Sequence, residues 1–258
     1  VKEIEEAMLR GEIDIAVHSM KDVPTIFPEG LALRCITERE DVRDVVILRP
    51  GVDTWTNLPQ GARIGTSALR RKSQLLHLRP DLQMVDIRGN VQTRLKKLTD
   101  ENLDAIILAA AGMHRLGYDA QIGEYLPVDV SIPAIGQGAL GIESRIDDDE
   151  TNGLIDFFNH PDTDWAVRGE RAFLKRLEGG CQVPIACHGT VDGDQLTLVG
   201  FVSDVDGVKC LKTSITGQVE ECEKLGTSIA DDLLIQGAGK ILNEVYQHET
   251  FNVEKEDV

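Results

Sequence analysis

The chain alternates short apolar runs with amphipathic stretches over its first 117 residues. Runs of five to eight mostly apolar residues predict buried strands, and they lie at 13–19, 30–36, 43–50, 63–67 and 83–87. Stretches in which apolar residues recur every three or four positions predict helices; these cover 2–11, 68–78 and 91–98, and 103–117 predicts a strand that runs into a helix. Single helices between strands are typical of βαβ units, so we expect a largely parallel sheet.

The pattern changes after residue 130. A Gly-rich segment, 131–145, precedes a short polar helix, and long amphipathic helices are predicted over 163–178 and 222–246. Between these helices, residues 190–217 alternate apolar and polar positions and carry two Asp-Gly turns, which predicts an antiparallel meander. The sequence therefore predicts an α/β protein whose last part, about 95 residues, is a small α+β domain.

The composition narrows the classes of function. A net charge of −17 and a pI near 4.7 argue against a nucleic-acid partner, because binding to the phosphate backbone needs positive surface. No apolar run has the length of a membrane span, and no signal-peptide pattern is seen. Five cysteines without regular spacing argue against a disulfide framework and favour a reducing, cytoplasmic compartment. The chain begins with Val1 in what looks like the middle of a domain, so we expect that an N-terminal segment is absent from it.

One basic segment departs from this acidic character. Residues 69–98 hold eight Lys or Arg and two Asp, a local charge of +6, so the other 228 residues sum to −23. Arg70, Arg71 and Arg88 are predicted to follow strand ends, where α/β domains bind their ligands. Guanidinium groups hold carboxylates and phosphates with paired hydrogen bonds, so we expect an anion site here.

The helix over 68–78 should add to this anion site. Thr66 or Ser67 is placed to cap its first turn, where free N–H groups and the positive end of the helix dipole favour an anion. Arg94 and Arg115 lie further along the same domain. The alternative is a solvated helix face with i,i+4 ion pairs, which is the interpretation we adopt for Lys72, Arg79, Lys96 and Lys97.

Two further segments carry candidate chemistry. Lys21 and Asp22 follow a strand and precede Pro24; such a carboxylate can stabilise a cation or exchange a proton with an amine, although a simple turn has the same spacing. His18, on the strand itself, is expected to be a hydrogen-bonded core residue. Cys181 follows Gly179-Gly180 directly, which predicts an accessible thiol that could be a nucleophile or an attachment point.

A metal site at this cysteine is not expected. Cys181, Cys187 and His188 have a spacing that fits no usual zinc pattern, and a fourth ligand is missing. The commoner fate of a cysteine, burial as an inert side chain, stays open from the spacing alone.

Taken together, these segments resemble the hydroxymethylbilane synthase (porphobilinogen deaminase) family. The strings that carry the resemblance run in the family's order along the chain: DIAVHSMKDVP, GTSALRR, DIRGNVQTRL, DAIILAAAGMHRLG, IPAIGQGALGIE and LEGGCQVPI. The resemblance implies a transferase of haem (porphyrin) biosynthesis that condenses four porphobilinogen molecules into the linear tetrapyrrole hydroxymethylbilane and releases ammonia at each step. It also implies a monomer without a nucleic-acid or membrane partner.

The resemblance assigns roles to individual residues. It implies a dipyrromethane cofactor attached through a thioether to Cys181, and catalysis by Asp22 with Lys21 beside it. The implied cofactor-binding residues are Cys181, Lys21, Ser67, Arg70, Arg71 and Arg88; the implied substrate-binding residues are Arg88, Arg94 and Arg115, and no metal is implied. Each pyrrole ring of the substrate carries an acetate and a propionate, which accounts for repeated arginines in an otherwise acidic protein.

The resemblance also implies three domains. The first two are similar to type 2 periplasmic-binding domains joined by a hinge, with domain 1 over 1–38 and 139–156 and domain 2 over 44–132. The third, over 161–258, is an α+β domain with an antiparallel sheet that carries the cofactor cysteine. Family members begin with a strand, a helix and a GKGLF-like segment that are not in this chain, so we expect domain 1 to lack its N-terminal part, and whether the fragment itself is active stays open from the sequence.

Two other hypotheses remain open from the residues alone. A non-catalytic two-domain receptor for polycarboxylate anions would use the same arginines but would leave Cys181, Lys21 and Asp22 without a purpose. An aminotransferase-like enzyme with a lysine Schiff base is weaker, because no phosphate-binding sequence is evident.

Overall fold

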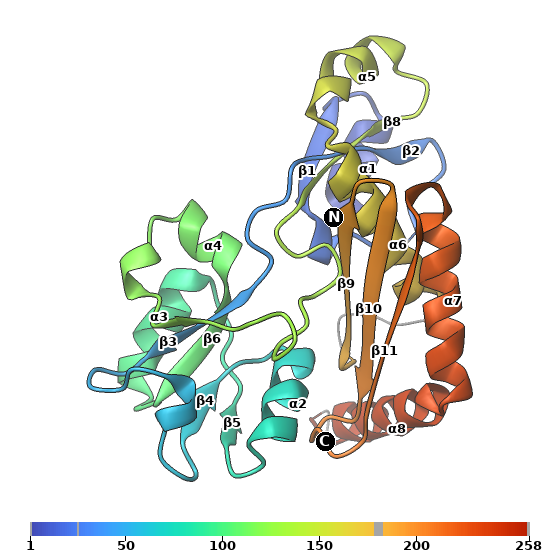
Figure 1. Ribbon diagram of the computed structural model, residues 1–258. Coiled ribbons are helices and arrows are strands. Elements are labelled where there is room, and N and C mark those ends of the chain that lie inside the picture. Colours follow the sequence, from blue (N-terminus) through green and yellow to red (C-terminus); the bar gives the residue numbers. More distant parts are fainter. Residues whose placement is uncertain (1, 25, 178–182, 257–258) are drawn as a thin grey trace.

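The computed structural model describes residues 2–24, 26–177 and 183–256, and its strands form three separate sheets (Figure 1). Most of the strands and helices predicted from the sequence are present within one to three residues of their expected bounds. The strand order and direction within the sheets differ from the prediction, because the chain crosses from one sheet to another and returns.

The first sheet is wholly antiparallel. It has the order β1-β8-β2 and is flanked by α1 and α5; the bounds are α1 Lys2–Leu9, β1 Ile15–Ser19, β2 Leu31–Ile36, β8 Leu140–Arg145 and α5 Asp149–Ile155. The central strand, β8, is contributed by a part of the chain more than 100 residues after β2. The local pattern of strand and helix could not reveal this return, so the expectation of parallel pairing was wrong here.

The second sheet is mixed. It has the order β5-β4-β6-β3-β7 and consists of β3 Asp44–Leu48, β4 Arg63–Gly65, β5 Gln83–Val85, β6 Ala105–Ala109 and β7 Glu124–Tyr125. Among the described strands of this sheet, β4 pairs in parallel with β5 and β6, whereas β3 runs antiparallel to β6 and β7. The helices are α2 Leu69–Leu78, α3 Val91–Asp100 and α4 Ala110–Arg115. The βαβ prediction is therefore confirmed only from β4 to β6.

The third sheet is the predicted antiparallel meander, with the order β11-β10-β9. Its elements are α6 Pro161–Arg176, β9 Ile185–Asp192, β10 Gln195–Ser203, β11 Cys210–Gln218, α7 Cys222–Ile235 and α8 Ala238–Glu256. The single helix expected over 222–246 is two helices, because Gly237 adopts a φ of +104° between them. The apolar faces of α6, α7 and α8 cover this sheet and form the largest hydrophobic cluster.

The start of α2 also differs from the prediction. The helix begins at Leu69 with Ala68 as its N-cap, and no side chain caps it. Thr66 Oγ1 instead accepts a hydrogen bond from the Ala68 amide at 3.3 Å, within the turn that precedes the helix. The N–H groups of the first turn are thus left uncapped by Thr66 and Ser67.

Two segments outside the helices and strands, 37–43 and 133–139, connect the first and second sheets side by side, and the second of them contains turns (Figure 1). The amide of Glu40 donates to the carbonyl of Gly138 at 3.0 Å, and Arg39 Nε donates to the carbonyl of Gln137 at 2.7 Å. Gly138 has a φ of +89°, and a Cβ there would lie 2.5 Å from the Glu40 carbonyl oxygen. Only glycine allows the two segments to approach this closely.

Glu170 of α6 ties these connecting segments to the third sheet. Its fully buried carboxylate accepts hydrogen bonds from Arg39 at 2.6 and 3.1 Å, from the Gly136 amide at 2.7 Å and from the Gly189 amide at 2.8 Å. Burial alone would raise the pKa of Glu170, but the charge and hydrogen bonds of Arg39, together with the nearby His188, outweigh it and lower the pKa to about 2. The carboxylate is therefore held in its charged form where the three sheets meet.

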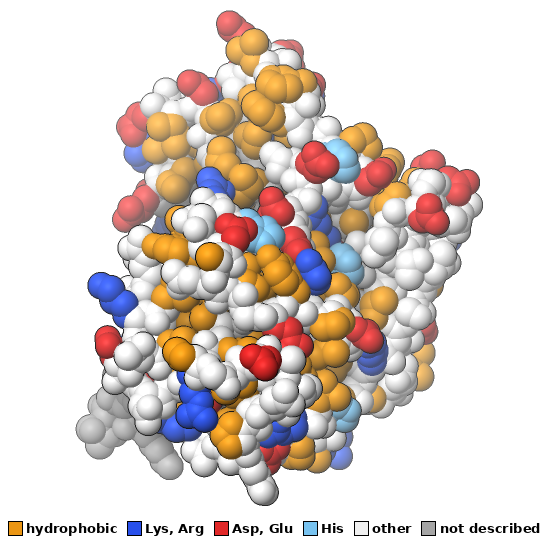
Figure 2. All heavy atoms as spheres, turned by 60° about the vertical axis from the view of Figure 1, so that its left-hand side comes forward, with side chains coloured by type: hydrophobic (Ala, Val, Ile, Leu, Met, Phe, Trp, Pro, Cys, Tyr) orange, Lys and Arg blue, Asp and Glu red, His pale blue; other side chains and the backbone are white. Residues whose placement is uncertain are grey.

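The surface matches the composition. On the face shown in Figure 2, acidic and basic side chains are interspersed with hydrophobic ones, so the net negative charge is not gathered in one patch there. Within the residues that the structure describes, no helix is long and apolar enough to cross a membrane.

Candidate active site

Lys21 and Asp22 lie in a short 3₁₀ helix, η1 Met20–Asp22, directly after β1. Met20 is buried and its amide donates to the carbonyl of Ala139 at 3.0 Å. Two glycines of the Gly-rich segment allow this position: a Cβ on Gly136 would lie 2.6 Å from Met20 Cβ, and one on Gly141 would clash with Met20 Sδ. The segment therefore fixes the backbone from which Lys21 and Asp22 project.

Two neighbouring cavities open beside Lys21 and Asp22, with volumes of about 640 and 340 Å³. They share five lining residues: Lys21, Asp22, Arg71, Arg94 and Gln137. The larger cavity also has Arg115 in its wall, and the smaller one has Ser67 and Arg70. We call the two cavities together the Asp22 cleft; its walls come from η1, from the connecting segments, from the helices of the second sheet and, in the smaller cavity, from α6 and β9.

Arg70 and Arg71 are buried in the wall of this cleft and share one carboxylate. Arg70 donates to Asp44 at 2.6 and 3.0 Å, and Arg71 Nε donates to Asp44 Oδ1 at 2.9 Å. Arg70 also donates to Gln137 Oε1 at 2.9 Å, and Arg71 donates to the carbonyl of Ile107 at 3.1 Å. Burial would raise the pKa of Asp44, but the two arginines outweigh it and hold the pKa far below its usual value.

This network leaves the cleft wall positive. Two guanidinium groups face one carboxylate, so one buried positive charge is not compensated within the group of Asp44, Arg70 and Arg71. Burial also lowers the pKa of Arg71, against the attraction of Asp44. A preformed positive wall of low mobility stabilises an anion more effectively than solvated arginines would, because little reorganisation is needed.

The other predicted cations divide into two groups. Arg94 lies in the wall of both cavities, and its Nε is a buried donor that has no hydrogen-bond partner among the described atoms. Arg115 is exposed at the end of α4 and lines the larger cavity. Arg88 is exposed before α3 and is not among the described residues that line the cleft.

Lys21 has an unusual environment for a lysine. Although the residue is exposed, the surrounding protein desolvates its ammonium group and the charge of Arg71 repels it, and both effects lower its pKa. Asp22 opposes them by attraction. The Lys21 side chain is therefore more ready to give up a proton than an ordinary lysine.

Of the remaining candidates, His18, Cys187 and His188 do not line the Asp22 cleft. His18 is confirmed as a satisfied core histidine, with its Nε2 2.7 Å from Glu143 Oε2. Cys187 is buried in the core, and burial raises the pKa of its thiol, while the neighbouring His188 points to the other face of β9. The described cysteines, Cys35, Cys187, Cys210 and Cys222, are all free thiols. The predicted attachment residue, Cys181, lies outside the described residues.

Of the residues expected on solvated helix faces, Lys97 makes an i,i+4 pair as expected, whereas Arg79 is half-buried and donates to the carbonyls of Thr56, Leu58 and Pro59. Arg79 pairs with Asp81 at 2.7 Å, and Lys97 pairs with Glu101 at 3.0 Å. Lys72 lies 3.7 Å from Asp206 in the hairpin between β10 and β11.

Sequence reasoning missed Asp44 and Gln137. Asp44 is one acidic residue at the start of an otherwise apolar strand, DVVIL, and a charge in such a run is a sign of a buried ion pair. Gln137 connects Arg70, Asp44 and the Val42 carbonyl and lies in the string GQG. The glycines on either side of Gln137 can be read from the sequence. Its hydrogen-bond partners lie more than 60 residues away, so the local sequence does not reveal them.

Comparison with known proteins agrees with this geometry. Residues 1–153 match the family model of the porphobilinogen deaminase dipyrromethane cofactor-binding domain, and residues 165–235 match that of the porphobilinogen deaminase C-terminal domain. The porphobilinogen deaminase of Geobacter metallireducens is 70% identical over 249 residues, which are 96% of this chain and 78% of the relative. The chain belongs to the porphobilinogen deaminase family. The porphobilinogen deaminase of Geobacter sulfurreducens is 68% identical over the same shares of the two chains.

More distant solved structures include periplasmic binding proteins. An arginine-specific periplasmic binding protein of Salmonella typhimurium is 17% identical, with a TM-score of 0.37 over 60% of this chain and 68% of the other. The fold class agrees with the expected α/β protein with a C-terminal α+β unit that has an antiparallel sheet.

The cleft fits the cofactor for which the family model is named. A dipyrromethane with the substituents of two porphobilinogen units carries four carboxylates, and the cleft offers the uncompensated charge of the Arg70–Arg71–Asp44 group together with Lys21, Arg94 and Arg115. The buried, unpartnered Nε of Arg94 is a donor that such a carboxylate would satisfy. The uncapped first turn of α2, beside Ser67, adds N–H groups at the positive end of a helix dipole.

Proposed function

We propose that the Asp22 cleft is the site at which this transferase condenses four porphobilinogen molecules, one after another, into hydroxymethylbilane. The reaction is inferred from membership of the porphobilinogen deaminase family. The observation that supports the site is that Asp22 and Lys21 lie in one cleft with Ser67, Arg70, Arg71, Arg94 and Arg115. These residues come from segments between 19 and 115 that the fold brings together.

The arginines and Ser67 bind and orient the anionic groups. Arg94 and Arg71 line both cavities and can each donate to carboxylates on either side of Asp22. Arg115 lies at the exposed end of α4 in the wall of the larger cavity, and we assign it to binding substrate carboxylates as they enter. Arg88 is exposed, and we keep it as a substrate and cofactor contact on the resemblance alone.

Asp22 handles charge and protons. Release of ammonia from porphobilinogen leaves a cationic ring system, and formation of the new carbon–carbon bond requires a proton to leave the ring that is attacked. A carboxylate can stabilise the first cation through its charge and accept the proton afterwards. Lys21, with its lowered pKa, holds a substrate carboxylate beside Asp22 and can share a proton with it.

The cofactor sets where the chain of rings begins. When bound, the dipyrromethane group supplies the pyrrole carbon to which the first substrate ring is joined. We assign Cys181 as its attachment point through a thioether, and we assign Lys21, Ser67, Arg70, Arg71 and Arg88 to the binding of its carboxylates. No metal enters this scheme.

We further propose a division of the chain into three domains, a monomeric state and a cytoplasmic location. The boundaries are 1–38 with 139–156 for domain 1, 44–132 for domain 2 and 161–258 for the C-terminal domain; each contains one of the three sheets. The connecting segments 37–43 and 133–139 are the hinge between domains 1 and 2. The protein works as a cytoplasmic monomer whose partner is its small-molecule substrate.

The reaction is tested by its stoichiometry. The purified chain is given porphobilinogen, and ammonia, remaining substrate and the mass of the product are measured. The proposal predicts one ammonia for each porphobilinogen consumed and a product of four joined rings. Saturable binding of porphobilinogen without release of ammonia would instead favour the alternative, a non-catalytic receptor for polycarboxylates.

A further inference from the structure

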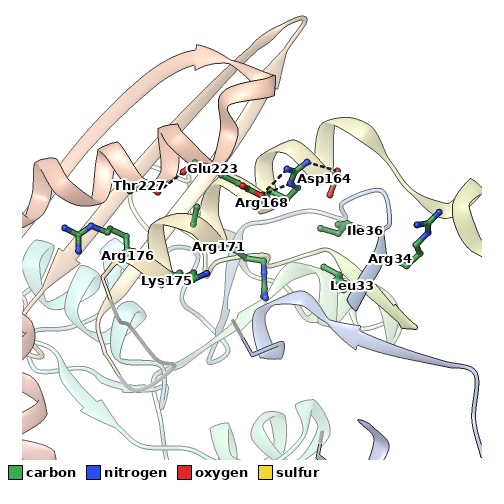
Figure 3. A pocket seen from close by; sticks show the side chains of 11 residues that line it. Leu33, Arg34, Ile36, Asp164, Arg168, Arg171, Lys175, Arg176, Glu223 and Thr227 are labelled. Atoms are coloured by element: carbon green, nitrogen blue, oxygen red, sulfur yellow. Dashed lines mark hydrogen bonds and ion pairs between the residues drawn. The ribbon is translucent and has the colours of Figure 1, made fainter. Parts of the chain in front are cut away.

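A second large cavity lies between the first sheet and the helices that cover the third. It has a volume of about 660 Å³ and is walled by β2, α6 and α7; Figure 3 shows its lining side chains. We call it the α6 groove. It shares no lining residue with the described walls of the Asp22 cleft, although α6 contributes Leu174 to the cleft and Arg171 and Lys175 to the groove.

Most of the cations in the α6 groove are already paired. Arg34 binds Asp156 at 2.6 Å, Arg168 binds Glu223 at 3.0 Å and Arg176 binds Asp231 at 2.7 Å. These pairs hold their charges in place along the rim and do not call for a ligand.

Arg171 and Lys175 are different. Neither has an ion pair within the described part of the chain, and they lie one helical turn apart on α6, the spacing at which like charges destabilise a helix. Both line the groove, as Figure 3 shows. An anion between them would relieve that repulsion and supply the missing charge.

Arg171 also contacts the segment that carries Asp22. Its guanidinium donates to the carbonyl of Val23 at 3.2 Å and to the carbonyl of Pro24 at 2.6 Å, and it lies 5.8 Å from the centre of the Phe27 ring. These neutral acceptors are weaker partners for a guanidinium than a carboxylate. A carboxylate ligand would therefore compete with them, one and two residues beyond Asp22.

The rest of the wall indicates the kind of anion. Leu33, Ile36 and Ala172 give the groove an apolar floor beside Arg171 and Lys175. A ligand that fills it should combine an apolar body with carboxylates, since a small inorganic anion would leave that floor in water. The acidic residues of the wall, Asp164 and Glu223, lie beside Arg168 (Figure 3).

We propose that the α6 groove is a second ligand site, which binds an aromatic dicarboxylate through Arg171 and Lys175 and slows catalysis by drawing Arg171 away from Val23 and Pro24. The proposed binding of the dicarboxylate does not depend on the proposed function, whereas the proposed effect on catalysis rests on that function. Arg171 is then a positioning residue, which acts on Asp22 through the backbone that follows it.

Calorimetric titration with phthalate, a benzene ring with two carboxylates, tests the binding. We expect saturable binding that weakens at least tenfold in Lys175→Glu, while Lys240→Glu, the same charge change on an exposed position of α8, binds as the wild type does. Arg94→Leu, in the cleft, should also leave it unchanged. No saturable binding, or equal binding to Lys175→Glu, would overturn the site; phosphate or citrate binding as tightly as phthalate would overturn the assigned ligand class.

Turnover measured with and without saturating phthalate tests the coupling. We expect the turnover number to fall several-fold in the wild type and in Lys240→Glu, and to stay constant in Lys175→Glu. The fall should be in kcat, since the groove is separate from the substrate cleft; a rise in KM alone would show competition in the cleft and refute the coupling. A chain that binds phthalate as expected but releases no ammonia from porphobilinogen would refute the proposed function and leave the binding site standing.

Discussion

Asp44 decides the character of the cleft at the scale of single residues. The residues alone placed Arg70 and Arg71 at a strand end and predicted an anion site there, and the structure places both in the cleft wall. What the residues could not show is that Asp44 and Gln137 satisfy much of the hydrogen-bonding capacity of the two arginines, because these partners lie 26 and 67 residues from Arg70 in the sequence. The two arginines thus act mainly as a fixed positive wall, and Arg94 has the donor left for a ligand.

Asp22 is the residue whose role is tested most simply. Asp22→Asn keeps the size of the side chain and removes its charge and its ability to accept a proton, so turnover of porphobilinogen should fall by about 10²- to 10⁴-fold. Urea unfolding should be unchanged, because Asp22 is exposed. The matched control is Asp53→Asn, at an exposed loop position outside the cleft, which should keep full turnover. Turnover above about a tenth of the wild-type rate in Asp22→Asn would remove Asp22 from its role.

At the scale of elements, the sequence predicted which segments are helices and strands better than how they pair. Periodicity depends on near neighbours, so α3, β6 and the β9–β11 meander lie close to where they were expected. The pairing of strands depends on how the chain crosses between them, which near neighbours in the sequence do not show. For this reason the insertion of β8 between β1 and β2, from a distant part of the chain, was not predicted. The uncapped start of α2 and the break at Gly237 were missed for another reason: serine, threonine and glycine are compatible with more than one backbone conformation.

The packing of the Gly-rich segment against η1 yields a second prediction. Gly141→Ala would place a Cβ against Met20 Sδ and 2.6 Å from Leu33 Cδ1, so the free energy of unfolding should fall by about 1–3 kcal/mol. Turnover should fall too, because Met20 precedes Lys21 and Asp22. Both are measured on one preparation, by urea unfolding and by release of ammonia.

Gly153→Ala is the control for this change. Gly153 lies in α5 with nothing within 4 Å of its added Cβ, so alanine there should stabilise the protein by up to about 1 kcal/mol and leave turnover intact. Wild-type turnover in Gly141→Ala, despite lower stability, would show that the glycine serves packing alone.

At the scale of the whole molecule, Glu170 joins the three parts and gives stability a pH dependence. Its folded pKa of about 2 lies below its usual value, so the stability that it contributes is complete above about pH 4.5 and is lost as the pH falls towards 2. From pH 6 to pH 3 the wild type should lose about 2 kcal/mol of unfolding free energy through this group.

The variant Glu170→Gln isolates the contribution of this carboxylate to the pH dependence of stability. At pH 6 the variant should be less stable by roughly 3–5 kcal/mol, because Arg39 is left buried without its carboxylate. The difference from the wild type should narrow by about 2 kcal/mol at pH 3. Glu29→Gln, at an exposed position, should follow the wild type throughout. A gap between wild type and Glu170→Gln that is constant from pH 6 to pH 3 in urea unfolding would contradict the lowered pKa.

The central claim is that the chain builds on a covalent primer held at Cys181. The measurement that tests it most directly is the intact mass of the purified chain beside Cys181→Ser and, as control, Cys210→Ser, which changes a free cysteine of β11. We predict a mass excess of two linked pyrrole units in the wild type and in Cys210→Ser, and its loss in Cys181→Ser. An unmodified wild-type chain, or an excess that survives in Cys181→Ser, would contradict the account.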